Sequence, residues 1–277
     1  MEQIADLRDL LAANGPRRGR MDQMRTIAIM NNKGGVGKTV TAINLADLLA
    51  REHGKRVVLC DCDGQKNLTD FFDLPGYDEE DCFNTAKLLL GDGEPVWSDN
   101  LVPVRPGLEL IPGSTDLYDL DFESIRDGAH EPRRLKEFVD VVREDDGADF
   151  FLFDCPPGFT VASVGALMAA DEVIVPLTVD GFSIRGLDTM QNQIRTMRRT
   201  GVRKVRVLLT QHHKCNVVRA GEALLEQAGF ARFQTVIRRS VKVPESTFKG
   251  QPLAEYVPGA MVTNDYRAFV RELLGEV

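Results

Sequence analysis

Short apolar runs that alternate with helical segments constrain the fold of this chain more than any other feature. Six runs have the length and composition of buried strands: residues 26–30, 57–60, 108–111, 150–153, 173–175 and 205–209. Several are apolar at nearly every position, which is typical of strands buried on both faces of a parallel sheet. The sequence therefore predicts an α/β fold with a doubly wound, mainly parallel sheet and helices on both faces.

Helical periodicity fills the intervals between these runs. We expect helices over residues 39–52, 84–90, 132–143, 161–169, 184–199, 219–227 and 264–274. No internal repeat or linker divides the chain, so we expect a single domain over residues 21–277. Residues 1–20 form an N-terminal extension, either a short docked helix or a basic arm, because helical spacing ends at Asn14-Gly15-Pro16 before three arginines.

Bulk properties indicate the compartment. No apolar run approaches the ~20 residues that cross a bilayer, and the N-terminus lacks the apolar core of a secretory signal. We therefore expect a cytoplasmic protein. An odd number of cysteines, five, then favours free thiols over disulfides. Cys60 and Cys62 flank one residue and are expected on the same face of a strand as small apolar side chains.

Charge is distributed unevenly along the chain. The net charge is −8, yet residues 185–249 contain 14 Lys and Arg against 4 Asp and Glu, a local balance of +10. Such asymmetry favours a face that binds a polyanion.

A glycine-rich segment follows the first predicted strand and leads into the first predicted helix. It reads KGGVGKT over residues 33–39, and its glycines allow backbone N–H groups to turn inward around an anion. Lys38 supplies charge to the β- and γ-phosphates, and the Thr39 hydroxyl is a ligand for Mg²⁺. Asn32 replaces the first glycine of the common phosphate-loop spacing. The segment predicts a site for ATP and Mg²⁺.

Lys33 narrows the class further. A second lysine, five residues before Lys38, resembles the deviant Walker A motif of the ParA/MinD family of P-loop ATPases. In that family the early lysine reaches across a dimer interface to the partner's nucleotide. The resemblance therefore implies an ATP-dependent homodimer in which Lys33 provides charge in trans.

Two later segments resemble further motifs of this family. The second predicted strand leads into DCDGQKN at residues 61–67, similar to the family's D-x-D-P-Q-G-N segment. By position, Asp63 orients the attacking water and Asp61 supports the metal. The segment DCPP at residues 154–157 is similar to the Walker B aspartate, here Asp154, followed by a Pro-Pro switch.

Together these segments assign a site. The expected catalytic residues are Lys33, Lys38 and Asp63, and the expected metal residues are Thr39, Asp61 and Asp154. The expected nucleotide contacts are Lys33, Gly34, Gly35, Val36, Gly37, Lys38, Thr39 and Val40, with Gln211 and Arg238 as candidates near the adenine or ribose.

Four positions depart from the family pattern. Gly64 and Lys66 stand where the family usually has Pro and Gly, Gly158 where Ser is common, and Val40 where a second Thr is frequent. The phosphate ligands are kept, so the departures concern the hydrolysis rate and the geometry of the switch.

The resemblance extends to the C-terminus. Residues 235–246 and 250–253 are similar to the last part of ParA partition ATPases, which bind DNA nonspecifically as ATP dimers and are stimulated by a ParB-like partner. Lysine and arginine bind phosphates without reading base sequence. The candidate DNA contacts, each of which could equally be a solvated charge, are Arg203, Lys204, Arg206, Arg238, Arg239 and Lys242.

The resemblance implies a Mg²⁺-dependent ATPase that drives plasmid or chromosome partition and is associated with the nucleoid in the ATP state. One alternative is a MinD-like or ParA-like ATPase that positions a protein cargo or a membrane-associated partner. A MinD-like switch ends in a basic amphipathic helix, whereas residues 264–274 have mixed charge, so we expect no stable membrane association. Another alternative is a binding module that uses ATP only for assembly, with Gly64 and Lys66 suppressing turnover.

Overall fold

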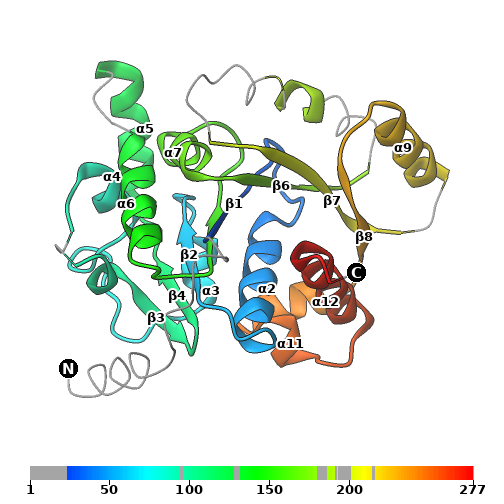
Figure 1. The fold of residues 1–277 in the computed structure, drawn as a ribbon, viewed down its shortest axis with the longest axis horizontal. Coiled ribbons are helices and arrows are strands. Elements are labelled where there is room, and N and C mark those ends of the chain that lie inside the picture. The colour runs from blue at the N-terminus through cyan, green and yellow to red at the C-terminus, as the bar shows by residue number, and fades with distance from the viewer. Residues whose placement is uncertain are drawn as a thin grey trace.

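One eight-stranded sheet organises the molecule, and its order is β3-β4-β2-β5-β1-β6-β7-β8 (Figure 1). The computed structural model describes residues 24–93, 96–127, 132–179, 186–190, 192, 201–213 and 216–276. The strands are β1 (Arg25–Ile29), β2 (Val57–Asp61), β3 (Val102–Arg105), β4 (Leu108–Ile111), β5 (Phe150–Asp154), β6 (Glu172–Leu177), β7 (Lys204–His212) and β8 (Arg232–Arg238). β3 pairs antiparallel with β4, and the other pairings are parallel.

Successive side chains of the central strands enter two separate hydrophobic cores. In β5, Phe151 and Phe153 pack into one core, whereas Phe150 and Leu152 pack into the other. A strand that is apolar at every position has this consequence, because neighbouring side chains point to opposite faces. The prediction of a mainly parallel sheet covered on both faces is confirmed.

Helices cover both faces (Figure 1). The first core contains side chains of α4 (Thr85–Leu90), α5 (Asp116–Asp127), α6 (Arg133–Glu144) and α7 (Val161–Ala169). The second contains side chains of α2 (Lys38–Arg51), α11 (Leu253–Tyr256) and α12 (Met261–Leu274). Further described elements are α3 (Asn67–Phe71), η1 (Trp97–Asn100), α9 (Asn216–Gln227) and α10 (Lys242–Phe248).

The sequence analysis did not predict the two edge strands, β3 and β8. β3 is half-buried along its whole length, and β8 carries the exposed Gln234 between the buried Phe233 and the half-buried Thr235. An edge strand has one neighbour only, so it lacks the continuous apolar pattern of a central strand. The short helices α3, α10 and α11 and the acidic helix α5 were also missed. The predicted extension at residues 1–20, most of the helix predicted at 184–199 and Cys215 lie outside the described residues.

The cysteines behave as predicted where they are described. Cys60, Cys62, Cys82 and Cys155 are free. Cys60 and Cys62 lie in the same core with their sulfur atoms 3.8 Å apart. They are small apolar side chains of the interior.

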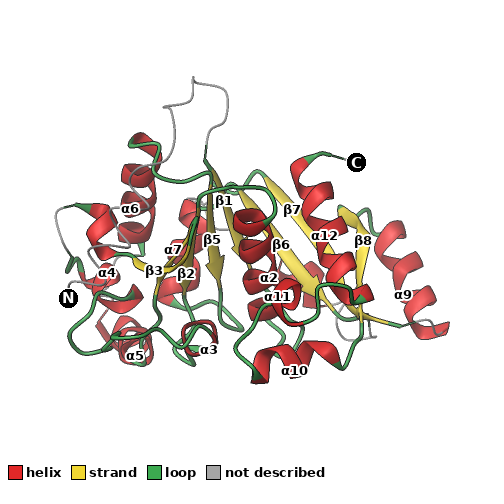
Figure 2. Ribbon diagram, turned by 90° about the horizontal axis from the view of Figure 1, so that it is seen from below, coloured by secondary structure: helices red, strands yellow, loops and turns green. Residues whose placement is uncertain are grey.

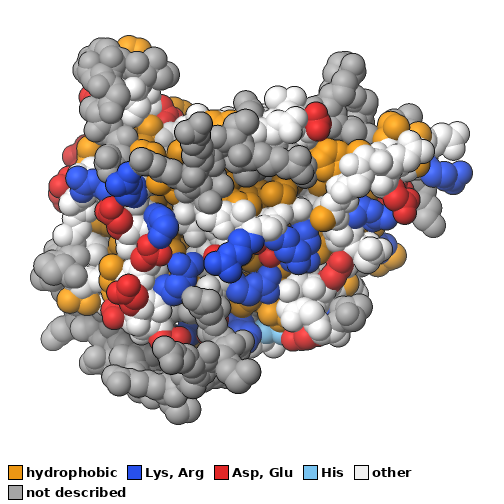
Figure 3. All heavy atoms as spheres, turned by 45° about the horizontal axis from the view of Figure 1, so that its top comes forward, with side chains coloured by type: hydrophobic (Ala, Val, Ile, Leu, Met, Phe, Trp, Pro, Cys, Tyr) orange, Lys and Arg blue, Asp and Glu red, His pale blue; other side chains and the backbone are white. Residues whose placement is uncertain are grey.

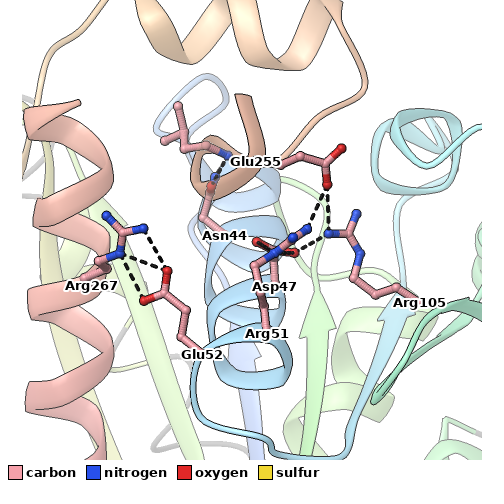
Figure 4. A network of polar contacts seen from close by, with 8 residues as sticks. Asn44, Asp47, Arg51, Glu52, Arg105, Glu255 and Arg267 are labelled. Carbon is pink, nitrogen blue, oxygen red and sulfur yellow. Dashed lines mark hydrogen bonds and ion pairs between the residues drawn. The ribbon is translucent and has the colours of Figure 1, made fainter. Parts of the chain in front are cut away.

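Polar contacts join α2 to β3 and to the C-terminal helices (Figure 4). Asp47 is fully buried and accepts hydrogen bonds from Arg51, at 3.2 Å, and from Arg105. Both arginines also reach Glu255 of α11, at 2.7 and 3.2 Å. Burial raises the pKa of Asp47, and the two guanidinium groups oppose that rise. The network fixes α2, which begins at the nucleotide loop, against the rest of the fold.

We expect Arg105→Ala to destabilise the protein, because Asp47 then keeps one of its two guanidinium partners. Removing the partner of a buried charge costs about 3–5 kcal/mol. Since Arg51 remains, we expect a loss of roughly 2–3 kcal/mol in the free energy of unfolding, measured by urea titration. Lys136→Ala, which breaks an exposed pair with Asp140 on α6, is the control and should cost less than about 1 kcal/mol. Equal losses would contradict this role for Asp47.

Candidate nucleotide site

The phosphate loop joins β1 to α2. Gly35 and Gly37 have φ angles of 71° and 89°, a left-handed conformation that glycine adopts without steric cost. A methyl group built on Gly34, Gly35 or Gly37 would meet no heavy atom within 4 Å. The space beside these glycines is therefore open, and the N-terminus of a 14-residue helix follows the loop directly. That arrangement suits an anion, because helix N-termini present unpaired N–H groups and a positive dipole end.

The end of β7 supports this loop. The Thr210 hydroxyl donates to the carbonyl oxygen of Val36 at 2.8 Å, and Gln211 Nε2 donates to that of Gly35 at 2.7 Å. Gln211, predicted near the adenine or ribose, thus contacts the loop backbone. Thr210 was missed by sequence reasoning, since a threonine inside a strand carries no distinguishing signal. Val40, in the first turn of α2, is half-buried against the second core.

The two lysines of the loop lie in different environments. Lys38 is 8% exposed, and its Nζ donates to the carbonyl oxygen of Lys33 at 3.2 Å. Burial lowers the pKa of Lys38, and the carboxylates of Asp154 and Asp63 oppose that effect. Lys33 is exposed, and its N–H donates to the side chain of Asn31 at 2.9 Å. One lysine therefore lies inside the phosphate loop and the other on its solvent side.

Two carboxylates meet at the carboxyl ends of β2 and β5. Parallel pairing puts Asp61 beside Asp154. Asp154 is almost fully buried, and the Thr39 hydroxyl hydrogen-bonds to its side chain. Within the described residues its Oδ1 has no hydrogen-bond partner. Burial, together with the charge of Asp61, raises the pKa of Asp154 well above its ordinary value. A buried carboxylate oxygen without a hydrogen-bond partner is destabilising, and a bound cation would compensate for the missing partner.

These donors fit a magnesium–nucleotide complex. Mg²⁺ binds through one or two protein oxygens and completes its shell with phosphate and water. The Thr39 hydroxyl and the Asp154 carboxylate supply such oxygens at the phosphate loop. No group of three His, Cys, Asp or Glu side chains in the described residues could hold a metal by itself. The donor set suits an ion that arrives with the nucleotide.

Asp61, predicted among the metal residues, has a different position in the structure. It is fully buried, and its oxygens accept hydrogen bonds from Asp63 N at 3.2 Å, Thr69 N at 2.9 Å and Thr69 Oγ1 at 2.7 Å. Burial raises the pKa of Asp61 to about 6 against these hydrogen bonds. Since both oxygens accept hydrogen bonds from the chain, Asp61 anchors the segment that carries Asp63. The predicted place of Asp61 among the metal residues, as a support of the metal region, stays a prediction.

Asp63 begins the loop between β2 and α3. It is half-buried, its Oδ1 accepts from Gln65 N at 2.9 Å, and its charge acts on Lys38. It therefore lies at the nucleotide side of the sheet, where the predicted water-positioning role requires a carboxylate.

Lys66 is one of the departures from the family pattern, and its surroundings show how the fold accommodates it. Its φ of 55° is left-handed, which favours the glycine usual at this position and costs other residues about 1–3 kcal/mol. Its ammonium pairs with Glu79. Glu79 in turn accepts from the N–H of Thr115 at 2.7 Å and from its hydroxyl at 3.0 Å. The ion pair ties the Asp63 loop to the start of α5 and offsets the backbone strain.

A neighbouring side chain bears on the second departure, the glycine at position 64. A Cβ at this position would lie 2.9 Å from the ring of Tyr118 on α5, closer than carbon atoms approach without repulsion. The Tyr118 hydroxyl also accepts a hydrogen bond from Gln65. Tyr118 therefore occupies the space beside Gly64, and a larger residue there would need the ring to shift.

The predicted DNA contacts fall at opposite ends of the strands. Arg203 and Lys204 are exposed at the amino end of β7, whereas Arg238, Arg239 and Lys242 lie at the carboxyl end of β8. A row of Lys and Arg side chains crosses the middle of the face in Figure 3. The six residues are therefore divided between the start of β7 and the end of β8.

Three of these cations are already engaged. Arg206 is 12% exposed, its Nε lies 2.5 Å from Glu172, and its guanidinium stacks on Phe233. These contacts hold the side chain against β6 and β8, and its predicted DNA contact stays a prediction. Arg238 forms a bidentate pair with Asp265 at 2.6 and 2.7 Å, and Lys242 pairs with Glu245. Arg238 thereby joins β8 to α12.

The fold and the site together define a P-loop nucleotide-binding protein. Residues 24–207 match a family model described as an AAA domain, AAA_31. The chain is 32% identical over 256 residues to the chromosome partitioning protein ParA of Caulobacter vibrioides, covering 91% of this chain and 94% of that protein. It is 32% identical over 261 residues to the chromosome-partitioning ATPase Soj of Thermus thermophilus, covering 92% and 97%. The chain belongs to the ParA/Soj family and is an ATPase of the ParA/MinD type.

Solved structures have a similar fold. Cobyrinic acid a,c-diamide synthase from Mycobacterium smegmatis, with bound ADP and magnesium, has a TM-score of 0.73 and 27% identity over 91% of this chain and 94% of its own. Apo McdA of Cyanthece has a TM-score of 0.77 at 20% identity, covering 91% and 100%, and shares the fold.

The pair between Lys66 and Glu79 predicts a pH-dependent stability. Burial alone would raise the pKa of Glu79, but hydrogen bonds from Lys66 and Thr115 lower it to about 2 from 4.5. A lowered acid pKa contributes stability that is complete above pH 4.5 and is lost as the pH falls towards 2. We expect Glu79→Gln to cost about 1–2 kcal/mol at pH 7, and the cost should shrink below pH 4.5. Urea unfolding at several pH values measures it.

Glu80→Gln, at the exposed neighbouring position, is the matched control and should show no such pH dependence. A difference between wild type and Glu79→Gln that stays constant down to pH 3 would refute the ion pair as its source.

Proposed function

We propose that this ATPase forms a homodimer on binding ATP, binds DNA nonspecifically in that state, and drives plasmid or chromosome partition. Hydrolysis, stimulated by a ParB-like partner, then releases the DNA. The proposal puts the protein in the cytoplasm, on the nucleoid while ATP is bound. A nucleotide can gate DNA binding in this way only if the two nucleotide states differ in their affinity for DNA.

The observation that carries the proposal is the placement of the two loop lysines. Lys38 is buried within the phosphate loop, whereas Lys33 is exposed on its outer side with its backbone fixed by Asn31 and Lys38. A lysine held at that point can supply charge to a nucleotide bound by a second copy, as an arginine finger does. The relatives named for chromosome partitioning support the same function.

The last helix favours DNA over a membrane as the surface that the ATP state binds. Apolar side chains of α12, from Val262 to Leu273, are buried in the second core, and Arg267 pairs with Glu52 of the loop after α2. A helix whose apolar face packs on its own protein cannot insert that face into lipid. None of the described helices has the length and apolar character of a membrane span.

Arg203 and Lys204 are the best candidates for the DNA contact. Both are exposed at the amino end of β7, away from the nucleotide loop, and neither forms an ion pair with another described residue. Exposed, unpaired cations release the most counterions from DNA. A dimer presents them twice, so ATP-dependent assembly strengthens binding without a new contact.

Asp63→Ala should abolish most ATP turnover while nucleotide binding persists. Loss of a group that positions the attacking water costs about 10²–10⁴-fold in rate, whereas the phosphate loop does not depend on that carboxylate. Phosphate release gives kcat, and a fluorescent nucleotide gives affinity. Asp70→Ala, at an exposed position of α3, is the control. If both variants turned over ATP like the wild type, Asp63 would have no catalytic role.

DNA binding should require ATP and Lys33. We expect a nonspecific duplex to bind with ATP and not with ADP, and Lys33→Ala to bind in neither state. Arg203→Ala/Lys204→Ala should lower the slope of log K against log salt by about 2 for each protomer that contacts the DNA. Lys136→Ala serves as a control for a charge lost elsewhere. Fluorescence anisotropy over a salt series gives the slopes, and binding that ignores the nucleotide would overturn the proposal.

A further inference from the structure

Two helices on the nucleotide side of the sheet carry large apolar side chains that are largely exposed in the described chain. On α5, Tyr118 is 47% and Phe122 66% exposed, one helical turn apart. On α10 and its preceding residue, Phe248 is 89% and Val241 71% exposed, two turns apart. Single exposed apolar residues are ordinary, whereas an apolar pair on one helix face that also carries unpaired charge is a candidate surface for another molecule.

The two faces carry opposite charge. The exposed carboxylates Asp116 and Asp119 accompany Tyr118 and Phe122 on α5. The exposed cations Arg239 and Lys249 flank Val241 and Phe248 at α10. None of these four charged side chains forms an ion pair with another described residue. We call the first set the acidic face and the second set the basic face.

Both faces lie on the same edge of the molecule, with the nucleotide site between them. α5 follows the carboxyl end of β4, α3 follows that of β2, and α10 follows that of β8. Figure 2 shows α5, α3 and α10 along one edge. A molecule that covers this edge would contact both faces and the phosphate loop at once.

We propose that the covering molecule is a second copy of this chain, with the acidic face of each protomer docked on the basic face of the other. The inference rests on the proposed ATP-dependent dimer and specifies how it is built. A two-fold axis at this edge can pair each face either with itself or with the other face. Self-pairing brings Asp116 and Asp119 against their own copies, and like charges in contact cost several kcal/mol. Cross-pairing joins opposite charges twice, so it is the arrangement that the charges favour.

Both faces are mechanically connected to the site. The ring of Tyr118 covers Gly64, and its hydroxyl accepts from Gln65, in the loop that carries Asp63. On the basic face, the N–H of Arg239 donates to the carbonyl oxygen of His212 at 2.9 Å. His212 follows Gln211, whose side chain donates to the phosphate loop. Docking of a second copy would therefore fix Tyr118 and, through it, the segment that holds Asp63. Arg239 accordingly belongs to the dimer interface and not to the DNA contact.

Charge reversal of each face separately tests the arrangement. The first variant is Asp116→Lys/Asp119→Lys, and the second is Arg239→Glu/Lys249→Glu. Sedimentation velocity with Mg²⁺ and a non-hydrolysable ATP analogue gives the dimer Kd. We expect each variant alone to dimerise about tenfold or more weakly than the wild type, because both of its faces then carry the same sign. An equimolar mixture should recover dimers of wild-type strength, since every contact again joins opposite charges.

The outcomes separate this inference from the proposal beneath it. A wild-type protein that stays monomeric with the analogue overturns the dimer itself. If the wild type dimerises and the second variant does so equally well alone, the basic face is not in the interface, and the inference fails. A mixture that stays monomeric overturns it too. Nucleotide affinity of each variant checks its folding, and Lys136→Glu on α6 should dimerise as the wild type does.

Discussion

The parallel pairing of β1, β2 and β5 is the constraint on which the rest of the structure depends. Its register sets Ile29 opposite Asp154 and Asp154 opposite Asp61, so three strand ends reach one line. The phosphate loop, the Asp63 loop and the Walker B aspartate all begin there. Parallel strands achieve this because their carboxyl ends share one edge, which antiparallel neighbours cannot provide. The apolar side chains behind that line keep the register, since a slip by one residue would move each of them into the opposite core, where it does not fit the packing.

Buried charge at this edge is costly, and the protein arranges its surroundings to hold it. Lys38 and Asp154 are both nearly inaccessible to solvent. Burial lowers the pKa of Lys38 and raises that of Asp154, so it favours the neutral form of both side chains. Such groups remain in place because α2 is fixed along its length. Asn44 accepts from the N–H of Leu253 at 2.9 Å, while Asp47 and its arginines lie one turn further on. A rigid helix keeps Lys38 and Thr39 where a Mg²⁺-nucleotide complex satisfies the charges.

The segment after β2 shows how a departure from a family pattern is accommodated by its neighbours. Tyr118 occupies the space beside Gly64, and Lys66 adopts a left-handed conformation while its ammonium pairs with Glu79. Tyr118 lies on α5, and Glu79 is hydrogen-bonded to Thr115, the residue before α5. The loop that carries Asp63 is therefore coupled to a helix that the family motif does not mention, and whose exposed face we assign to the dimer.

The sequence by itself determined the central strands, the covering of the sheet on both faces, and the phosphate loop with Lys33, Lys38 and Thr39. These follow from local pattern, because continuous apolar runs and glycine spacing act over a few residues. Only the tertiary structure decided that Asp61 anchors a loop, that Arg206 is engaged with Glu172, and that Thr210 and Gln211 hold the phosphate loop. It also found β3 and β8, whose edge positions leave them no continuous apolar run. Each of these roles depends on a partner between 8 and 176 residues away, and a side chain's sequence neighbours do not specify such a partner.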